Sequence, residues 1–169
     1  MKILVRSLSA VLILIAFSLN VNAQANETAT ATATIIEPIT LTNVTDMNFG
    51  NIAVSAAGDV VLSPAGVRTP SGGITLPSVA GTVSAATFDV DGEANFTYSI
   101  TLPAAAITIT NGTDNLTVDT WTSNPTPTGT LDGTGYQLLQ VGATLDIPLG
   151  TESAGTYTGP SFTVTVNYN

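Results

Sequence analysis

Hydrophobic and polar side chains alternate along much of this chain with the period of a β-strand. The clearest case lies near the C-terminus, where Phe162, Val164, Val166 and Tyr168 are separated by single polar residues. Successive side chains of a strand point to opposite faces, so these four residues are expected on the core side. The pattern predicts a half-buried terminal strand.

Similar short segments rich in Thr, Val and Ile recur along the chain, with turn residues between them. The predicted strands cover residues 39–44, 60–63, 86–90, 96–102, 107–110, 116–121, 136–141, 144–147 and 161–168. Asp91-Gly92 and Asn111-Gly112 are typical of hairpin turns, and the two prolines within residues 123–130 indicate a loop. No helical period follows residue 23. The pattern predicts an all-β fold, a sandwich or a barrel.

The first 23 residues differ from the rest in composition. Lys2 and Arg6 precede an apolar run at residues 8–19, and Val21-Asn22-Ala23 supplies small residues for cleavage. This pattern is typical of a secretory signal peptide and is too short for a membrane anchor. We therefore expect a signal peptide at 1–23, an extended arm at 24–38 and a β-sandwich domain at 39–169, exported through the general secretory route without membrane insertion.

Charge and composition narrow the function classes. Once Lys2 and Arg6 are removed with the signal, Arg68 is the one basic residue beside 12 acidic residues. A nucleic-acid surface needs Lys or Arg to neutralise phosphates, so nucleic acid is not an expected partner. The chain contains no His and no Cys, which excludes a Ser/His/Asp or Cys/His triad and any imidazole or thiolate metal site. We expect neither an enzyme nor a bound cofactor.

The arm has a strand period of its own. Ala29, Ala31, Ala33 and Ile35 share one face, and threonines occupy the other. Three interpretations remain open at this stage. The arm is a flexible linker, an edge strand of its own domain, or a donor strand that completes the sheet of a neighbouring subunit through main-chain hydrogen bonds.

Asp89, Asp91 and Glu93 form the one acidic cluster with a spacing that suggests a metal. Three carboxylates within five residues are the hard oxygen ligands that Ca²⁺ prefers. The segment lacks the later acidic residue of an EF-hand loop. The alternative is a hairpin turn with an acidic tip, which we favour.

Trp121 is the single tryptophan and precedes the proline-rich loop. With Asp119 and Asn124 nearby, its ring is a candidate platform for stacking a sugar. The alternative, which we favour, is packing at the core or its rim.

Several strings resemble a bacterial secreted domain family. They include Asp46-Met-Asn-Phe-Gly-Asn-Ile52, Tyr98-Ser-Ile-Thr-Leu-Pro103, Val141-Gly-Ala-Thr-Leu145 and the segment from Gly155 to Tyr168. The family is similar to subunits of Mat/Ecp-type and archaic chaperone–usher fimbriae and to spore coat protein U. This chain lacks the cysteine pair that many fimbrial subunits have.

The resemblance implies an incomplete immunoglobulin-like sandwich that is completed by a donated strand. The expected function is a structural subunit of a surface fibre or coat, found in the periplasm, at the cell surface or outside the cell. Its expected partners are further copies joined by strand exchange, a periplasmic chaperone and an outer-membrane usher. The donor is the arm with Ala29, Ala31, Ala33 and Ile35, and the acceptor lies beside the terminal strand. The alternative is a self-contained secreted binding module for carbohydrate.

Overall fold

The computed structural model describes residues 24–169, and the predicted signal peptide at residues 1–23 lies outside the described part. The chain divides into two compact units, and Ile36–Asn169, which holds all the strands of the described part, is called the compact unit below. The other unit contributes residues 24–35 to the described part, and these form no strand.

Residues 24–169 contain strands and connecting segments but no helix. The strands are β1 (Thr40–Thr45), β2 (Ala53–Val54), β3 (Gly58–Leu62), β4 (Arg68–Pro70), β5 (Ile74–Thr75), β6 (Ala86–Asp91), β7 (Thr97–Thr101), β8 (Ile107–Thr110), β9 (Asn115–Asn124), β10 (Thr128–Thr130), β11 (Tyr136–Ile147) and β12 (Thr165–Tyr168).

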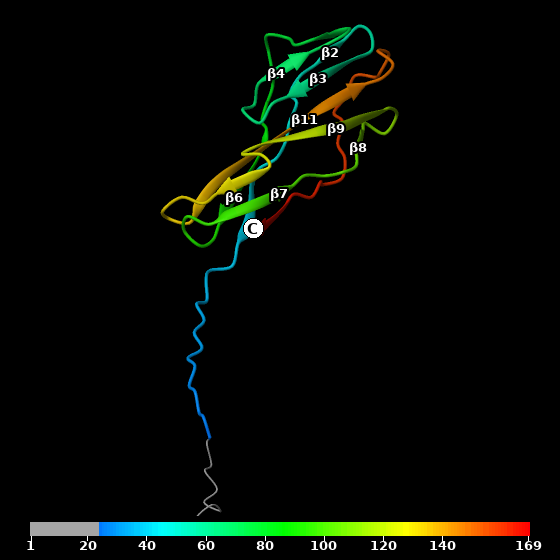
Figure 1. Cartoon of the computed structure of the whole chain (residues 1–169). Coiled ribbons are helices and arrows are strands. Elements are labelled where there is room, and N and C mark those ends of the chain that lie inside the picture. The colour runs from blue at the N-terminus through cyan, green and yellow to red at the C-terminus, as the bar shows by residue number, and fades with distance from the viewer. Residues whose placement is uncertain (1–23) are drawn as a thin grey trace, which may run out of the picture. The chain divides into compact units, whose positions relative to one another are not determined.

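The long strand β11 organises the larger, seven-stranded sheet (Figure 1). Its first half pairs with β6 and its second half with β3, both antiparallel and on the same edge. Its other edge pairs with β9, which in turn pairs with β8. The register between β11 and β9 shifts between Gly142 and Thr144. On the other edge, β11 passes from β6 to β3 at the same place.

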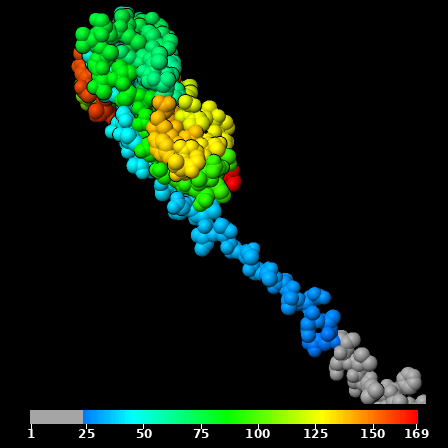
Figure 2. All heavy atoms as spheres, turned by 90° about the vertical axis from the view of Figure 1, so that its left-hand side faces the viewer, coloured from blue at the N-terminus to red at the C-terminus, as the bar shows by residue number. Residues whose placement is uncertain are grey.

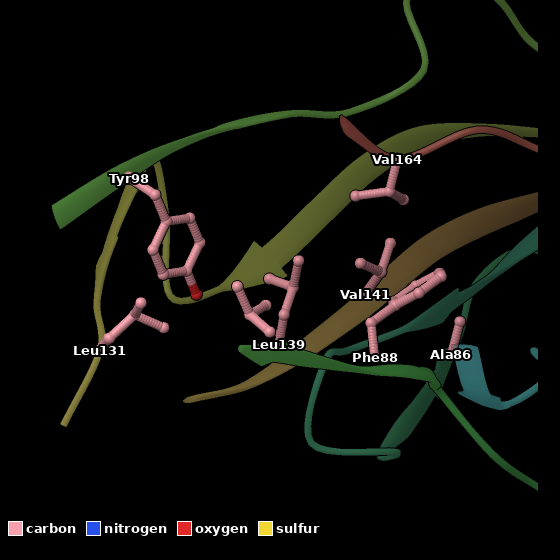
Figure 3. Close-up of a cluster of buried hydrophobic side chains, with 8 residues drawn as sticks. Ala86, Phe88, Tyr98, Leu131, Leu139, Val141 and Val164 are labelled. Atoms are coloured by element: carbon pink, nitrogen blue, oxygen red, sulfur yellow. The ribbon is translucent and has the colours of Figure 1, made fainter. Parts of the chain in front are cut away.

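A three-stranded antiparallel sheet, β10-β7-β12, forms the second layer. Tyr98 and Val164, from β7 and the segment before β12, point toward Phe88, Leu139 and Val141 of the larger sheet (Figure 3). Tyr98, Leu139 and Val141 are fully buried. The expectation of an all-β sandwich is therefore confirmed.

The core consists of two clusters along β11. The first, shown in Figure 3, lies between the two sheets. The second contains Val118, Leu145 and Ile147 and packs against partly buried residues of the connecting segments, including Phe49 and Ile52. Figure 2 shows that residues around 60–80 (green) and residues around 120–140 (yellow to orange) form opposite ends of the compact unit.

The structure corrects several local predictions. Asn111-Gly112 closes the β8–β9 hairpin as expected, with Gly112 at φ +91°. Asp91-Gly92 is not a hairpin turn, because β6 and β7 belong to different sheets. Strand pairing reaches into the predicted loop at 123–130, since β9 extends to Asn124 and β10 begins at Thr128.

Other differences concern strand boundaries. The two strands predicted within 136–147 are one continuous strand, β11, and the terminal strand begins at Thr165 rather than at residue 161. The short strands β2, β4, β5 and β10 were not predicted. None of the described residues forms a helix long and apolar enough to cross a membrane.

Candidate functional site: an apolar groove

Two strands with an unpaired edge lie close together in the compact unit. β1 is the last strand of the larger sheet and pairs only with β6, and β12 is the last strand of the smaller sheet and pairs only with β7. β1 and β12 contact each other, so the two sheet edges flank one side of the sandwich. An unpaired edge presents a row of free N–H and C=O groups, which is a template for another strand.

A groove of about 1370 Å³ reaches the edge of β1 at Asn43 and has no lining residue from β7, β10 or β12. Its floor is the inner face of β8, β9 and the second half of β11, where Ile107, Val118 and Leu145 lie in one row of paired residues. The alternation of these strands turns their apolar residues to the same face. Val118 and Leu145 are buried, whereas Ile107 and its neighbour Ile109 are only half-buried. The floor therefore retains accessible apolar surface.

Residues 46–54 form one wall of the groove. Met47, Phe49 and Ile52 pack against the core from this segment. Arg68 of β4 holds the wall, because its Nη1 donates to the backbone oxygens of Phe49 at 2.7 Å and Asn51 at 2.8 Å. The one basic residue in the described part of the chain thus fixes the position of a groove wall.

Residues 152–162 form the opposite wall, and Ser153 fastens it to the β8–β9 hairpin. The Ser153 N–H donates to Asp114 Oδ2 at 2.7 Å, and its C=O accepts from the Tyr157 hydroxyl at 2.8 Å. Farther along, Thr110 and Thr158 exchange two backbone hydrogen bonds. The wall is therefore held at two points, by the turn of the β8–β9 hairpin and by Thr110 at the end of β8.

Acidic groups surround this wall. The hydrogen bonds from Ser153 lower the pKa of Asp114 below its usual value, and partial burial together with Asp114 and Glu152 raises the pKa of Tyr157. Glu152 lines the groove, and its Oε1 accepts from the Leu149 N–H at 2.8 Å. Its Oε2 is buried without a hydrogen-bond partner. A buried carboxylate oxygen without a partner therefore lies at this end of the groove.

The predicted terminal strand lies where the smaller sheet meets the groove. Val164 is buried, and Phe162, Val166 and Tyr168 are partly buried and pack against the first core cluster. Phe162 lines the groove, whereas Val166 and Tyr168 belong to β12. The predicted strand therefore borders the groove only at its beginning, which includes Phe162.

Trp121 also lines the groove. Its ring lies 4.5 Å from the ring of Phe162, measured between centroids, and its indole N–H donates to the Ala105 oxygen at 3.3 Å. The polar atom of the candidate sugar platform is thus engaged within the chain, and the ring packs at the rim of the core.

The acidic residues Asp89, Asp91 and Glu93 are not gathered around one point. Asp89 accepts from the Tyr136 hydroxyl at 2.8 Å, and Glu93 accepts from the Glu37 N–H at 3.0 Å. Asp89 and Asp91 lie within β6 rather than at a turn. Among residues 24–169 no three His, Cys, Asp or Glu side chains are placed to hold a metal ion.

The candidate donor residues Ala29, Ala31, Ala33 and Ile35 lie in a segment without assigned strand structure, and all four are exposed. Ile35 is 97% exposed. No described strand provides main-chain partners for this segment.

The groove wall at 46–54 was missed as a functional element. Its signal is present in the sequence, because Met47 and Phe49 are separated by the polar Asn48, and Ile52 and Val54 are separated by the small Ala53. The segment contains only the two-residue strand β2, which pairs with the equally short β5. So short an alternation was not recognised as a core-facing segment.

Comparison with known proteins gives one finding. No curated protein and no solved structure matches the chain. A model of a protein family, described as a domain of unknown function (DUF4402), matches residues 39–168. This range covers the sandwich, both edge strands and the whole groove, and the chain therefore belongs to the DUF4402 family.

Proposed function

We propose that this protein is an exported structural subunit of a surface fibre or coat that assembles by β-strand donation. Residues 28–36 of one subunit occupy the groove of the next. The observation that carries the proposal is the groove itself, which exposes apolar residues of the core between strand β1 and the segment leading to β12. An extended segment that binds there gains main-chain hydrogen bonds and buries small side chains.

The arm has the chemistry that such a groove requires. Its alternation places Ala29, Ala31, Ala33 and Ile35 on one face, and threonines on the other face suit contact with water. Each new main-chain hydrogen bond contributes about 0.5–1.5 kcal/mol net, and Ile35 adds apolar burial. Summed along the arm, these terms are large enough to hold two subunits together.

The resemblance to chaperone–usher fimbrial subunits and spore coat protein U supports the same proposal. In that scheme a periplasmic chaperone protects the groove before assembly and an outer-membrane usher delivers the subunit. The groove would be the surface that both the chaperone and the next subunit engage. The carbohydrate-binding alternative has less support, because Trp121 packs on Phe162 and its N–H is already bonded.

The test removes residues 24–36 from the mature protein. We expect the truncated protein to remain folded and to be monomeric, whereas the full-length mature protein forms high-mass species in sedimentation and fibres in electron micrographs. A synthetic peptide of residues 24–36 added to the truncated protein should bind it and raise its melting temperature.

Matched peptide variants test the face of the arm that binds. Ala31→Asp should weaken binding, because it brings an unpaired charge into an apolar groove. Thr32→Asp adds the same charge on the opposite face and should bind nearly as well as the original peptide. A full-length mature protein that stays monomeric at high concentration would contradict the proposal.

A further inference from the structure

The segment that joins the arm to β1 is held by a small hydrogen-bond network. The Tyr168 hydroxyl accepts from the Glu93 N–H at 2.6 Å and donates to the Glu37 oxygen at 2.9 Å. The Glu37 N–H donates to Glu93 Oε2 at 3.0 Å. We call Glu37, Glu93 and Tyr168 the exit clamp. Figure 1 shows the C-terminal end beside the beginning of β1, where this network lies.

The surroundings of the clamp fit the Tyr168 ring closely. Phe96 meets it edge to face, with 5.7 Å between ring centroids. A Cβ on Gly92 would lie 2.2 Å from the Tyr168 hydroxyl oxygen, so a glycine is needed there to admit the phenol. The clamp links β12, the β6–β7 connection and the residues before β1, which are three segments distant in sequence.

Strand donation has a competing reaction within one subunit. The free edge of β1 is the nearest sheet edge to the arm along the chain, because β1 begins at Thr40 and pairs only with β6. An arm that reversed direction after residue 36 would form a hairpin with its own β1. Such a hairpin would cover the edge that borders the groove and leave no donor for a neighbour.

We propose that the exit clamp suppresses this hairpin and so reserves the arm for a second copy of the chain. The inference rests on the proposed function. A tight turn across residues 36–39 would need the backbone groups of its central residues free to reorient. Both backbone polar groups of Glu37 are already bonded in the clamp, and Pro38 has no N–H. The following proline also keeps Glu37 extended.

The clamp therefore disfavours pairing of the arm with the subunit's own β1. It adds no contact between the arm and a neighbouring subunit. Its hydrogen bonds must break before the hairpin can close. Loss of the two bonds of the Tyr168 hydroxyl should shift the ratio of hairpin to free arm by roughly tenfold.

The test uses the absence of cysteine from the chain. In the full-length mature protein, Ala33→Cys and Thr42→Cys introduce two thiols that face each other in a two-residue hairpin between the arm and β1. At low protein concentration, oxidation within one chain reports the hairpin, and oxidation between chains reports donation. The parent protein should give little intrachain disulfide.

Tyr168→Phe keeps the ring against Phe96 and removes the hydroxyl. It should raise the intrachain disulfide about tenfold and reduce assembly in parallel. Tyr136→Phe removes a hydroxyl that donates to Asp89, outside both the groove and the clamp, and should leave the intrachain disulfide unchanged. Glu93→Ala should act like Tyr168→Phe, and Glu93→Gln, which keeps an oxygen acceptor, should act less. If Tyr168→Phe fails to fold, the intrachain disulfide of Glu93→Ala provides the test of the clamp.

An intrachain disulfide that is equally abundant in the parent and in the folded clamp variants would overturn the inference, even if the parent assembles. A parent that shows little intrachain disulfide and still does not assemble would instead contradict the proposed function.

Discussion

The two halves of the larger sheet have the same residue pattern but different covers. In the first half, which we call the covered half, Leu139 and Val141 of β11 lie beneath the smaller sheet and are fully buried. In the second half, which we call the open half, Leu145 and Ile147 of the same strand line the groove. One strand thus supplies both a finished core and a groove floor.

The difference lies in the opposing layer rather than in the hydrophobicity of the strand. Strands β7, β10 and β12 oppose the covered half, whereas the segments 46–54 and 152–162 border the open half. Half-buried Ile107 and Ile109 retain apolar area there. Burial of such area contributes about 25 cal/mol per Å², so the open half is where an added strand would stabilise the domain most.

The largest expected effect comes from shortening one leucine in each half. Leu139→Ala should lower the free energy of unfolding by roughly 2–5 kcal/mol, because it leaves a cavity in a closed core. Leu145→Ala should fall at the lower end of that range, because Leu145 already borders a hollow. Urea unfolding of the monomer measures both. Equal losses at the two positions would mean that the open half is packed as tightly as the covered half.

The next largest effect on stability is expected at Gly142, where β11 passes from the covered half to the open half. A Cβ on Gly142 would lie 2.2 Å from the Leu62 backbone oxygen, a contact that only a backbone shift can relieve. Gly142→Ala should therefore cost about 1–3 kcal/mol of unfolding free energy. Gly133→Ala is the control, since a Cβ there meets nothing within 4 Å. If both variants unfold at the same urea concentration, the junction is more tolerant than its geometry indicates.

The sequence predicted the longer strands of both halves better than the segments that border the open half. Alternation with a period of two located β1, β6, β7, β8 and most of β9, because each strand carries that pattern locally. The open half depends on which strand opposes which, and β2 with β5 is held by pairing between distant segments. No local pattern therefore predicts the groove, because the segments that line it are distant in sequence.

Two similar turn sequences show where local reasoning stops. Gly112 has a positive φ and closes a hairpin, as the sequence predicted. Gly92 stands in the same dipeptide context, but its connection crosses between sheets, and its missing Cβ makes room for the Tyr168 hydroxyl. Glycine is required at both positions, but Gly92 is required because of Tyr168, which lies 76 positions away in the sequence.

A smaller effect is expected at the wall of the open half. Arg68→Met keeps the aliphatic stem but removes both hydrogen bonds to the backbone oxygens of Phe49 and Asn51. The bond to Asn51 is exposed and the bond to Phe49 is part-buried, so we expect a loss of only about 1–2 kcal/mol. Hydrogen exchange should accelerate at residues 46–54 and stay unchanged in β7. Faster exchange throughout both sheets would show that Arg68 supports the whole sandwich rather than the wall.

The smallest effect concerns one carboxylate in each half. At the end of the open half, partial burial and then the neighbouring carboxylates Asp59 and Asp119 raise the pKa of Asp146. At the end of the covered half, hydrogen bonds from the Thr134 hydroxyl and then from the Tyr136 N–H lower the pKa of Asp132. The two groups should therefore affect the pH dependence of stability in opposite directions.

A raised folded-state pKa means that the native protein holds the Asp146 proton longer than the unfolded chain does, so this group's contribution to stability falls as pH rises through that window. Asp146→Asn should raise the melting temperature at about pH 7, and the gain should vanish below the ordinary aspartate pKa of about 3.9. Asp132 has the opposite sign, because its contribution is present at neutral pH and is lost as pH falls toward its lowered pKa. Asp132→Asn should lower the melting temperature at about pH 7, with a smaller penalty in acid. Melting temperatures of both variants at about pH 7 and below about pH 3.9 measure the difference. A change of melting temperature with the same sign for the two variants at about pH 7 would contradict the electrostatic contrast between the halves.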